Sequence, residues 1–377
     1  MIPLTKPDFD SCDEQSLLEA FRSTFASGDG PDCRAFEREL SAYLGAKHVF
    51  FVSSCTAALD LAYMVKDFPA GSEVLVPNFT FTSTALAPIL NNLKVVLVDV
   101  DPENGNIDFD DAKRKVTKNT VAISPVDYAG NPVNITQMNR LAEDHGLYVV
   151  HDAAQSFGAE YKGKKIGIFA DVTCFSFHGT KNLVVGEGGA LATDDDDLAQ
   201  KILIARDKGT DKHLYLRDPN KRGYYEYVAK GNSYVQSNLL AAIGRSQLKK
   251  IDRLNKRRES LAKIYIEAFK NLPNIKLPKV TPDAKSNWHL FYILVPPAIK
   301  NDLIENIRLG GVMANIHYSP LHMNRYYQIT EDSKKSLFPN SVKYFDSLMR
   351  IPMFPSLTDA EASMIMDVVR SSILKLS

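Results

Sequence analysis

The residues best suited to chemistry are a lysine and the glycines that follow it along the chain. In residues 175–178, phenylalanines alternate with polar residues, which is the pattern of a strand with one covered face. Lys181 follows in a short turn, and three glycines within 186–189 allow a close approach of the backbone that side chains would block. Such a hollow suits a Schiff-base lysine, whose amine must be desolvated and held in place. Most lysines are solvated surface residues, so this interpretation of Lys181 needs support from the rest of the chain.

A candidate anion-binding site lies at a junction between a strand and a helix. Residues 48–52 are predicted to form a buried strand and 57–65 a helix, with the sequence Ser-Ser-Cys-Thr at 53–56 between them. The free N–H groups and the dipole at the start of a helix attract an anion, and hydroxyl groups add donors. The alternative is that Ser54 or Thr56 only caps the helix.

An acid at the end of a later strand is the third candidate group, beside the lysine and the helix start. Asp152 follows the apolar residues 147–150 and His151. Its carboxylate is either a solvated cap or a buried acid that needs a cationic partner, because an unpaired buried charge is costly. Helix start, acid and lysine are the minimal set for pyridoxal phosphate: they would take its phosphate, its pyridine nitrogen and its aldehyde carbon. The chain has no GxGxxG or GxxxxGK[ST] motif, which argues against a dinucleotide or P-loop site.

The elements that must position these residues alternate between strands and helices. This alternation predicts an α/β protein with a doubly wound, mostly parallel sheet whose ligands bind at the carboxyl ends of the strands. The expected strands after the first are 73–76, 94–100, 121–126, 147–150, 172–177 and 189–193.

The second half of the chain has a different pattern. Residues 208–232 are polar and aromatic with little periodicity, and two helices are expected at 236–248 and 254–272. We expect a large domain at 1–250, whose first 30 residues are irregular apart from a helix near 14–26, and a small α+β domain at 251–377. The elements expected in the small domain are strands at 290–295 and 312–318 and helices at 302–309 and 359–374.

Composition excludes several classes of function. The 377 residues contain 45 Lys and Arg against 45 Asp and Glu, so no net charge favours nucleic acid or an anionic membrane. The four cysteines show no CxxC spacing, and the acidic run at 194–197 falls at the expected start of a helix, so no metal site is predicted. Because there is neither a signal-peptide pattern nor a long apolar run, we expect a cytoplasmic protein.

Six segments carry a resemblance to a known family. Together they resemble the DegT/DnrJ/EryC1/StrS group of sugar-nucleotide aminotransferases, which belongs to the fold-type-I superfamily of aspartate aminotransferase, and the resemblance covers nearly the whole chain. It implies a pyridoxal phosphate enzyme with a pyridoxamine phosphate intermediate form, and a homodimer with its active site at the subunit interface. The segments are 53–57, 77–84, 152–155, 175–182, 186–189 and 317–322.

The resemblance also implies roles around the cofactor ring. Lys181 would form the Schiff base and move the proton between cofactor and substrate carbons, and Asp152 would pair with the pyridinium. Gln155 would lie against the ring or its phenolic oxygen. Phe81 would stack on the ring face and exclude water, the alternative being simple core packing.

The cofactor phosphate is assigned to other residues by the same resemblance. Cys55, Thr56 and Ser176 would hold it, although Ser176 could instead be a strand hydroxyl bonded to the backbone. Cys55 stands where most members have Gly. Ser233 stands where many members have an Asn that reaches the phosphate of the partner subunit, and Asp127 stands where His is frequent, a change without a chemical account at this point.

The chain looks closest to TDP-4-keto-6-deoxyhexose 4-aminotransferases, such as the TDP-fucosamine-forming enzymes of surface polysaccharide (O-antigen) synthesis. The pointers are 175–178, Cys55, 208–210 and 231–234. The implied amino donor is L-glutamate, and the other substrate is a TDP-linked ketosugar. Lys208, Arg217 and Tyr318 are candidate ligands of the sugar diphosphate, unless they are solvated surface side chains.

Three alternatives stay open to different degrees. A sugar 3-dehydrase would have His in place of the lysine, and Lys181 argues against it. A non-enzymatic relative could share the fold, but the lysine, acid and phosphate residues are intact. Amination at C-3, or of a UDP-sugar, is not distinguished by sequence motifs, because one hydroxyl or epimer changes specificity through the shape of the pocket. The C-4 configuration of the product is likewise not predicted.

Overall fold

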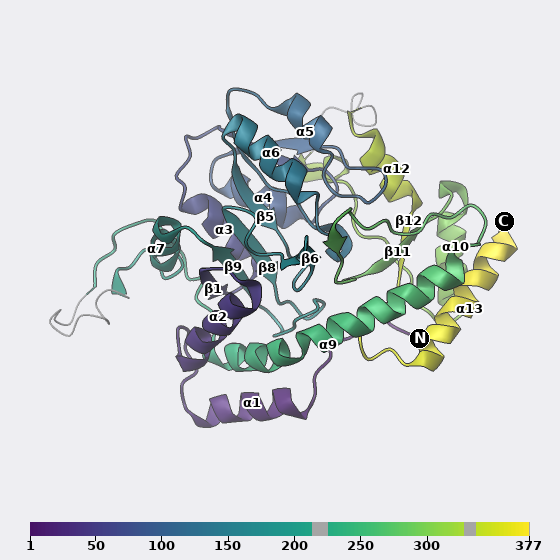
Figure 1. Ribbon diagram of the computed structural model, residues 1–377, viewed down its shortest axis with the longest axis horizontal. Coiled ribbons are helices and arrows are strands. Elements are labelled where there is room, and N and C mark those ends of the chain that lie inside the picture. Colours follow the sequence, from purple (N-terminus) through teal and green to yellow (C-terminus); the bar gives the residue numbers. More distant parts are fainter. Residues whose placement is uncertain (213–224, 328–336, 377) are drawn as a thin grey trace.

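The structure is a computed structural model that describes residues 1–212, 225–327 and 337–376 (Figure 1). Its centre is a seven-stranded sheet with the strand order β1-β9-β8-β5-β4-β2-β3. The strands from β8 to β3 in this order are parallel, and β9 is antiparallel to both of its neighbours. The expected α/β class with a mostly parallel sheet is therefore confirmed. The strands are β1 (His48–Val52), β2 (Glu73–Pro77), β3 (Lys94–Val98), β4 (Thr120–Ile123), β5 (Tyr148–Asp152), β8 (Val172–Ser176) and β9 (Gly189–Thr193).

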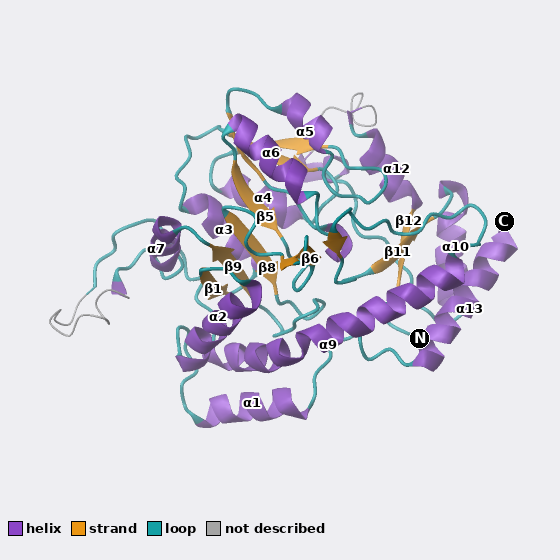
Figure 2. Cartoon of the chain, viewed as in Figure 1, coloured by secondary structure: helices purple, strands orange, loops and turns teal. Residues whose placement is uncertain are grey.

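Helices cover both faces of this sheet (Figure 2). Neighbouring residues of a strand point to opposite faces, so Phe51 belongs to one core cluster and Phe50 to the other. Burial on both faces explains why these strands are continuously apolar in sequence. One face carries α2 (Pro31–Leu44), α5 (Phe109–Lys115) and α6 (Ile135–His145), and the other carries α3 (Cys55–Met64), α4 (Thr82–Leu90) and α7 (Asp196–Ala205).

One long helix, α9 (Asn238–Phe269), runs from the large core toward the C-terminal part of the chain (Figure 1). The prediction of two separate helices in this region is wrong. Its apparent interruption is a charged stretch around Lys250, whose ammonium lies 2.6 Å from the carboxylate of Asp13 in α1 (Ser11–Arg22). The stretch contains neither Pro nor Gly, and Lys and Arg are good helix formers, so the helix continues without a break.

The C-terminal part has its own hydrophobic core, which includes the second half of α9. The prediction of a strand at 312–318 is wrong: only isolated bridges join Val312 to Ile2 and Asn315 to Arg350, and the chain then turns toward His317. The division at 250 and 251 falls inside α9 and stays a prediction. The elements are β11 (Phe291–Leu294), β12 (Leu348–Ile351), α10 (Pro297–Leu309), α12 (Pro339–Ser347) and α13 (Asp359–Leu376).

Short elements complete the described part of the chain. A small three-stranded sheet has the order β10-β6-β7 and lies beside the main sheet. Its strands are β6 (Glu160–Tyr161), β7 (Lys164–Lys165) and β10 (Ala284–Lys285), and the 3₁₀ turns are η1 (Tyr128–Gly130), η2 (Leu321–Met323) and η3 (Arg325–Tyr327).

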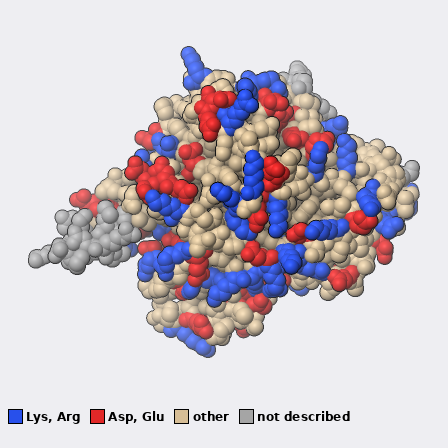
Figure 3. All heavy atoms as spheres, in the orientation of Figure 1, with Lys and Arg blue, Asp and Glu red and all other residues tan. Residues whose placement is uncertain are grey.

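The surface has no dominant charge on the face that Figure 3 shows, where basic and acidic side chains are interspersed. This agrees with the equal numbers of acidic and basic residues in the sequence. Among the described helices, none combines the length and the apolar character needed to cross a membrane.

Candidate active site

A cavity of about 430 Å³ opens at the edge of the main sheet where β2, β4, β5 and β8 end. In doubly wound sheets this is the edge at which ligands bind. Ser233 and Lys208 do not line the cavity, and Arg217 lies outside the described residues. The predicted site residues that do line it are Cys55, Thr56, Phe81, Asp152, Gln155, Ser176, Lys181 and Tyr318.

Lys181 is presented to the cavity by a tight turn after β8. Its backbone N–H donates to the carbonyl of His178 at 2.9 Å, and the Gly179 N–H donates to the carbonyl of Gly186 at 2.8 Å. The Lys181 Nζ has no hydrogen bond or ion pair with any residue that the structure describes. Burial lowers the pKa of this amine, which favours the neutral, nucleophilic form.

Asp152 ends β5 and is almost completely buried. Its Oδ2 accepts a hydrogen bond from Thr84 Oγ1 at 2.7 Å, and its Oδ1 accepts one from the Ala154 N–H at 3.1 Å. Burial raises the pKa of the carboxyl, while these hydrogen bonds and the Lys181 charge act in the opposite direction. Such an acid is ready for a cationic partner, as a protonated pyridine nitrogen would be.

The start of α3 has the form of an anion site. Ser54 is the cap of the helix, since its Oγ accepts a hydrogen bond from the Ala57 N–H at 3.0 Å. Thr56 is not the cap: its hydroxyl lies 2.7 Å from Ser83 Oγ. A Cβ on Gly189 would lie 2.4 Å from the Cys55 nitrogen, so only glycine lets β9 pack this closely against the helix start.

Aromatic side chains form another wall of the cavity. Phe81 is 53% exposed, whereas Phe79 is buried in a hydrophobic core, so the core-packing alternative for Phe81 is wrong. The rings of Phe81 and Tyr318 lie 5.7 Å apart, and Gln155 Nε2 donates to Tyr318 Oη at 3.2 Å. Burial raises the pKa of Tyr318 to about 12, so the hydroxyl keeps its proton near neutrality.

These features fit pyridoxal phosphate. The helix start and Ser176 can take a phosphate, Asp152 can take a protonated ring nitrogen, and Phe81 offers a flat apolar surface to the ring. Lys181 is the one lysine of the cavity, and no arginine lines it among the described residues.

The structure explains the presence of Asp127 by its buried hydrogen bonds, which the sequence did not reveal. Its Oδ1 accepts hydrogen bonds from His151 Nε2 and from the Val133 N–H, both at 2.8 Å, and its Oδ2 accepts one from Ser156 Oγ at 2.6 Å. All of these groups are buried beside the strand end that carries Asp152. Asp127 therefore fixes the segment around Asp152.

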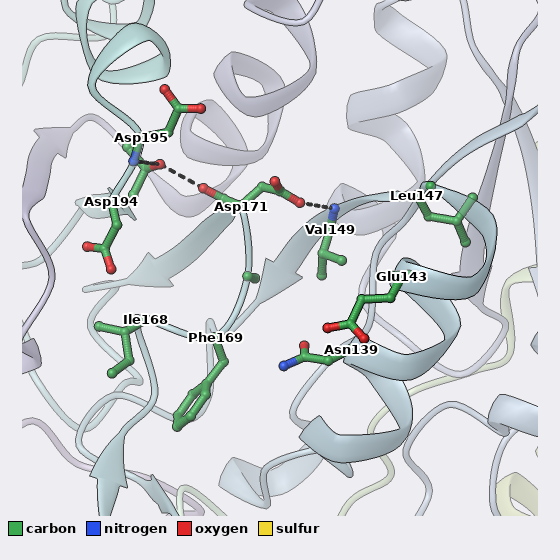
Figure 4. Close-up of a pocket in the computed structure, with 13 residues that line it drawn as sticks. Asn139, Glu143, Leu147, Val149, Ile168, Phe169, Asp171, Asp194 and Asp195 are labelled. Carbon is green, nitrogen blue, oxygen red and sulfur yellow. Dashed lines mark hydrogen bonds between the residues drawn. The ribbon is translucent and has the colours of Figure 1, made fainter.

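A second hollow, of about 520 Å³, lies at the opposite edge of the sheet, before β5 and β8 (Figure 4). Three of its four acids are already bonded to the backbone of the fold. Asp171 Oδ2 accepts from the Val149 N–H at 2.7 Å, Asp194 Oδ1 from the Lys47 N–H at 2.7 Å, and Asp195 caps α7. The described residues contain no group of three or more His, Cys, Asp or Glu that could hold a metal ion.

Comparison with known proteins places the chain among sugar aminotransferases. The model of the DegT/DnrJ/EryC1/StrS aminotransferase family matches residues 7–370. Spore coat polysaccharide biosynthesis protein SpsC of Bacillus subtilis is 35% identical over 375 residues, covering 98% of this chain and 96% of SpsC. UDP-4-amino-4,6-dideoxy-N-acetyl-beta-L-altrosamine transaminase of Campylobacter jejuni is 30% identical over 387 residues, covering 100% of this chain and 98% of that protein. The solved structure of Helicobacter pylori PseC, an aminotransferase of pseudoaminic acid biosynthesis, superimposes with a TM-score of 0.91 at 27% identity, covering 99% of each chain.

Proposed function

Because the chain belongs to the DegT/DnrJ/EryC1/StrS aminotransferase family, we propose that it transfers an amino group from L-glutamate to C-4 of a TDP-linked 4-keto-6-deoxyhexose. The chain is a pyridoxal phosphate-dependent sugar aminotransferase with the fold-type-I architecture. The observation that carries the proposal is the meeting of Lys181, Asp152 and the start of α3 in one cavity. The proposed product is a TDP-4-amino-4,6-dideoxyhexose for a surface polysaccharide such as O-antigen, and the name of SpsC supports a role in polysaccharide synthesis.

The residues of the cavity have different proposed roles in the reaction. Pyridoxal phosphate, when bound, withdraws electrons from the carbon that carries the transferred nitrogen. Lys181 Nζ takes the proton from that carbon of L-glutamate and, in the second half-reaction, delivers a proton to C-4 of the sugar. Asp152 holds the ring nitrogen in its protonated form, and Cys55, Thr56 and Ser176 are the proposed phosphate ligands. Phe81 and Gln155 would keep the ring in place and limit the access of water.

The diphosphate of the sugar nucleotide needs positively charged groups, and apart from Lys181 the described residues of one chain place no lysine or arginine in the cavity. Lys181 is engaged in the chemistry, and no arginine lines the cavity among the described residues. Lys208 is exposed and paired with Asp207. We therefore propose a homodimer in which Lys208 and Ser233 of one subunit serve the site of the other, while Tyr318 contacts the sugar nucleotide in its own site.

A UDP-linked ketosugar is the second candidate substrate, because a relative that is 30% identical over the whole chain is named as a transaminase of a UDP-sugar. Both substrates would use the same reacting groups, and the shape of the pocket would decide between them. Amination at C-3 is the remaining alternative.

The experiment that tests the proposal determines the product. Purified protein with pyridoxal phosphate is incubated with L-glutamate and TDP-4-keto-6-deoxyglucose, and the product is analysed by NMR. The expected result is an amino group at C-4, and the H-4 couplings give its configuration. Parallel reactions with a UDP-linked 4-ketosugar and with a 3-ketosugar test the two alternative substrates. Amination of either one in preference to the TDP-4-ketosugar would overturn the proposed substrate.

A variant separates chemistry from binding. Lys181→Ala removes the amine that moves the proton, so we expect catalysis to fall to background while the nucleotide sugar still binds, as measured by calorimetry. Activity that survives in Lys181→Ala would contradict the role of this lysine.

A further inference from the structure

Asn182 follows Lys181 directly in the chain but does not line the active-site cavity. The residue is only 4% exposed. Its Nδ2 donates to Asn255 Oδ1 at 2.7 Å and to the backbone carbonyl of Asn287 at 3.1 Å, and its Oδ1 lies 3.1 Å from His289 Nδ1. The buried amide therefore uses both of its N–H groups and its oxygen on three partners.

The chemistry of these partners fixes the orientation of the Asn182 amide. A backbone carbonyl can only accept, so the amide nitrogen faces Asn287 and the amide oxygen faces the imidazole of His289. His289 Nδ1 must then carry the hydrogen. Burial, with smaller effects of Lys181 and two arginines, lowers the pKa of His289 well below its ordinary value, so the ring is neutral. All three hydrogen bonds of Asn182 thus have a defined direction.

The partners of Asn182 belong to parts of the chain that lie outside the turn carrying Lys181. Asn255 is in the middle of α9, and residues 287–289 lead into β11 of the C-terminal part. The backbone hydrogen bonds within residues 177–188 hold the shape of the turn, and Leu183 and Val185 place the chain after it in a hydrophobic core. Apolar burial is not directional. The hydrogen bonds of Asn182 can therefore supply an orientation that the core alone does not.

Asn287 connects this arrangement to another wall of the cavity. It is almost completely buried, and its Nδ2 donates to the backbone carbonyls of Gln155 at 2.9 Å and of Phe157 at 3.0 Å. Gln155 lines the cavity and follows Asp152 closely in the chain. The residue that accepts from Asn182 thus also holds the chain at the other side of the site.

We propose that Asn182 is a positioning residue, whose three hydrogen bonds hold Lys181 at a fixed place relative to the cavity wall that contains Gln155. The amine of Lys181 stands on a flexible four-carbon chain, so its reach depends on where the backbone is held. A misplacement of about 1 Å at a reacting group can lower a rate by about 100-fold. The inference rests on the proposed role of Lys181 and does not depend on the identity of the sugar.

The test separates the reach of the lysine from the binding of the cofactor. Excess pyridoxal phosphate is mixed with the apoenzyme, and the first-order rate of Schiff-base formation is followed by absorbance. Pyridoxamine phosphate has an amine in place of the aldehyde and cannot form this bond, so its dissociation constant, measured by calorimetry, reports on the rest of the site.

In Asn182→Ala we expect the rate of Schiff-base formation to fall by about 10- to 100-fold. The dissociation constant of pyridoxamine phosphate should change by less than about threefold, because the groups that bind phosphate and ring are unchanged. In the reaction with L-glutamate, kcat should fall by a factor similar to that of the Schiff-base rate, while KM stays within about threefold of the wild type.

Two further variants show whether the effect passes through these hydrogen bonds. Asn255→Ala removes one of the three partners and should lower the same rate by about three- to tenfold, but should add little in the background of Asn182→Ala. Asn238→Ala is the matched control, since Asn238 is a buried residue of the same helix that accepts from the Asp32 N–H at 2.8 Å and donates to the Phe25 carbonyl at 3.2 Å. It does not line the cavity and should leave the rate unchanged.

Equal losses in the Schiff-base rate and in the affinity for pyridoxamine phosphate would mean that Asn182 only supports the fold, and would overturn the proposal. An unchanged rate in both Asn182→Ala and Asn255→Ala would also overturn it. If Asn182→Ala does not fold, Asn255→Ala still gives both quantities. Schiff-base formation that survives in Lys181→Ala would instead contradict the proposed role of Lys181, so the two failures are distinguishable.

Discussion

Asp152 can serve a cofactor only if its carboxylate stays in one orientation, and Thr84 is the side chain that holds it. The Thr84 hydroxyl is completely buried and lies 2.7 Å from Asp152 Oδ2. A second hydroxyl, that of Thr80, lies 2.9 Å from Thr84 Oγ1 and completes a short chain of hydrogen bonds toward the acid. This chain stabilises the ionised form of an acid whose pKa is raised by burial.

Thr84→Val removes this donor at nearly constant volume. The pKa of Asp152 should rise further, and the acid should hold the protonated ring nitrogen less well. Removing a buried hydrogen bond to a charged group should lower both the cofactor affinity and kcat by about 10- to 100-fold. Titration with pyridoxal phosphate followed by absorbance measures the affinity, and Thr84→Ser, which keeps the hydroxyl, is the control. Equal affinities of the two variants would show that the hydroxyl has no such role.

His317 gives a prediction about pH. Burial, with smaller effects of Arg350 and Lys181, lowers the pKa of His317 from 6.5 to about 4. As the pH falls between these values, the unfolded chain binds a proton at this residue that the folded chain does not, so the free energy of unfolding decreases. The contribution of His317 is complete above pH 6.5 and is lost toward pH 4, and partial exposure makes it smaller than the full shift implies.

The measurement is denaturant unfolding at about pH 7 and about pH 5 for the wild type and for His317→Asn. The wild type should lose more stability than the variant over this interval, because only the wild type carries the titrating ring. Parallel losses in both proteins would show that other groups account for the whole pH dependence.

At the residue scale, the sequence predicted the groups that line the cavity better than the groups that support them. Lys181 and Asp152 could be proposed from the sequence because each lies at or shortly after the end of a strand, and the end of a strand can be located from the apolar pattern. The contact of Arg350 with His317 in the cavity wall was missed because Arg350 lies within a strand, where nothing in the sequence indicates what its side chain contacts. The role of Asp127 follows only from its three hydrogen-bond donors in the structure, which come from segments up to 29 residues away.

Among the secondary-structure elements, the contact between β9 and the start of α3 is the one that shapes the proposed phosphate site. Gly189 begins β9, and a side chain there would collide with the backbone of Ser54 and Cys55 at 2.4 Å. Because both partners are backbone, neither can rotate out of the way, and one of the two elements must shift.

Gly189→Ala should therefore move the helix start and weaken cofactor binding by about 10- to 100-fold, with some loss of stability. Gly179→Ala is a matched control in the same region, since its Cβ would meet only the Gly186 carbonyl oxygen at 3.8 Å. Titration with pyridoxal phosphate and thermal unfolding measure both effects. Unchanged affinity in Gly189→Ala would mean that the helix start does not hold the phosphate.

The elements that were predicted wrongly from the sequence make contacts with distant segments of the chain. The helix α9 is continuous through a charged stretch whose Lys250 contacts Asp10 and Asp13 at the start of α1, more than 230 residues earlier. Residues 312–318 have the composition of a strand, yet their partners are the N-terminal segment and β12, which offer one bridge each. By contrast, the strands of the main sheet are covered on both faces, so their apolar runs alone were sufficient to predict them.

At the scale of the whole molecule, the described residues of one chain bring together the groups proposed for the chemistry, but no lysine or arginine other than Lys181 for a sugar diphosphate. The cavity has Lys181 as its one lysine and lacks arginine among the described residues. Ser233 is exposed, forms an isolated bridge with Asp207 and does not line the cavity of its own chain. Both facts support the proposed dimer, in which each active site is shared by two subunits.

Subunit complementation tests the shared site. Lys181→Ala removes the reactive amine, and Ser233→Glu would place a negative charge against the partner's cofactor phosphate, so each variant alone should be nearly inactive. In a mixed dimer, one site receives Lys181 from one chain and Ser233 from the other and is native. Co-refolding or co-expression of the two variants should therefore restore about a quarter of the wild-type activity, because about half of the dimers are mixed and have one working site. If Ser233 served its own chain, every site in the mixture would carry one of the two lesions and no activity would return, whereas a monomer in analytical ultracentrifugation would contradict the dimer itself.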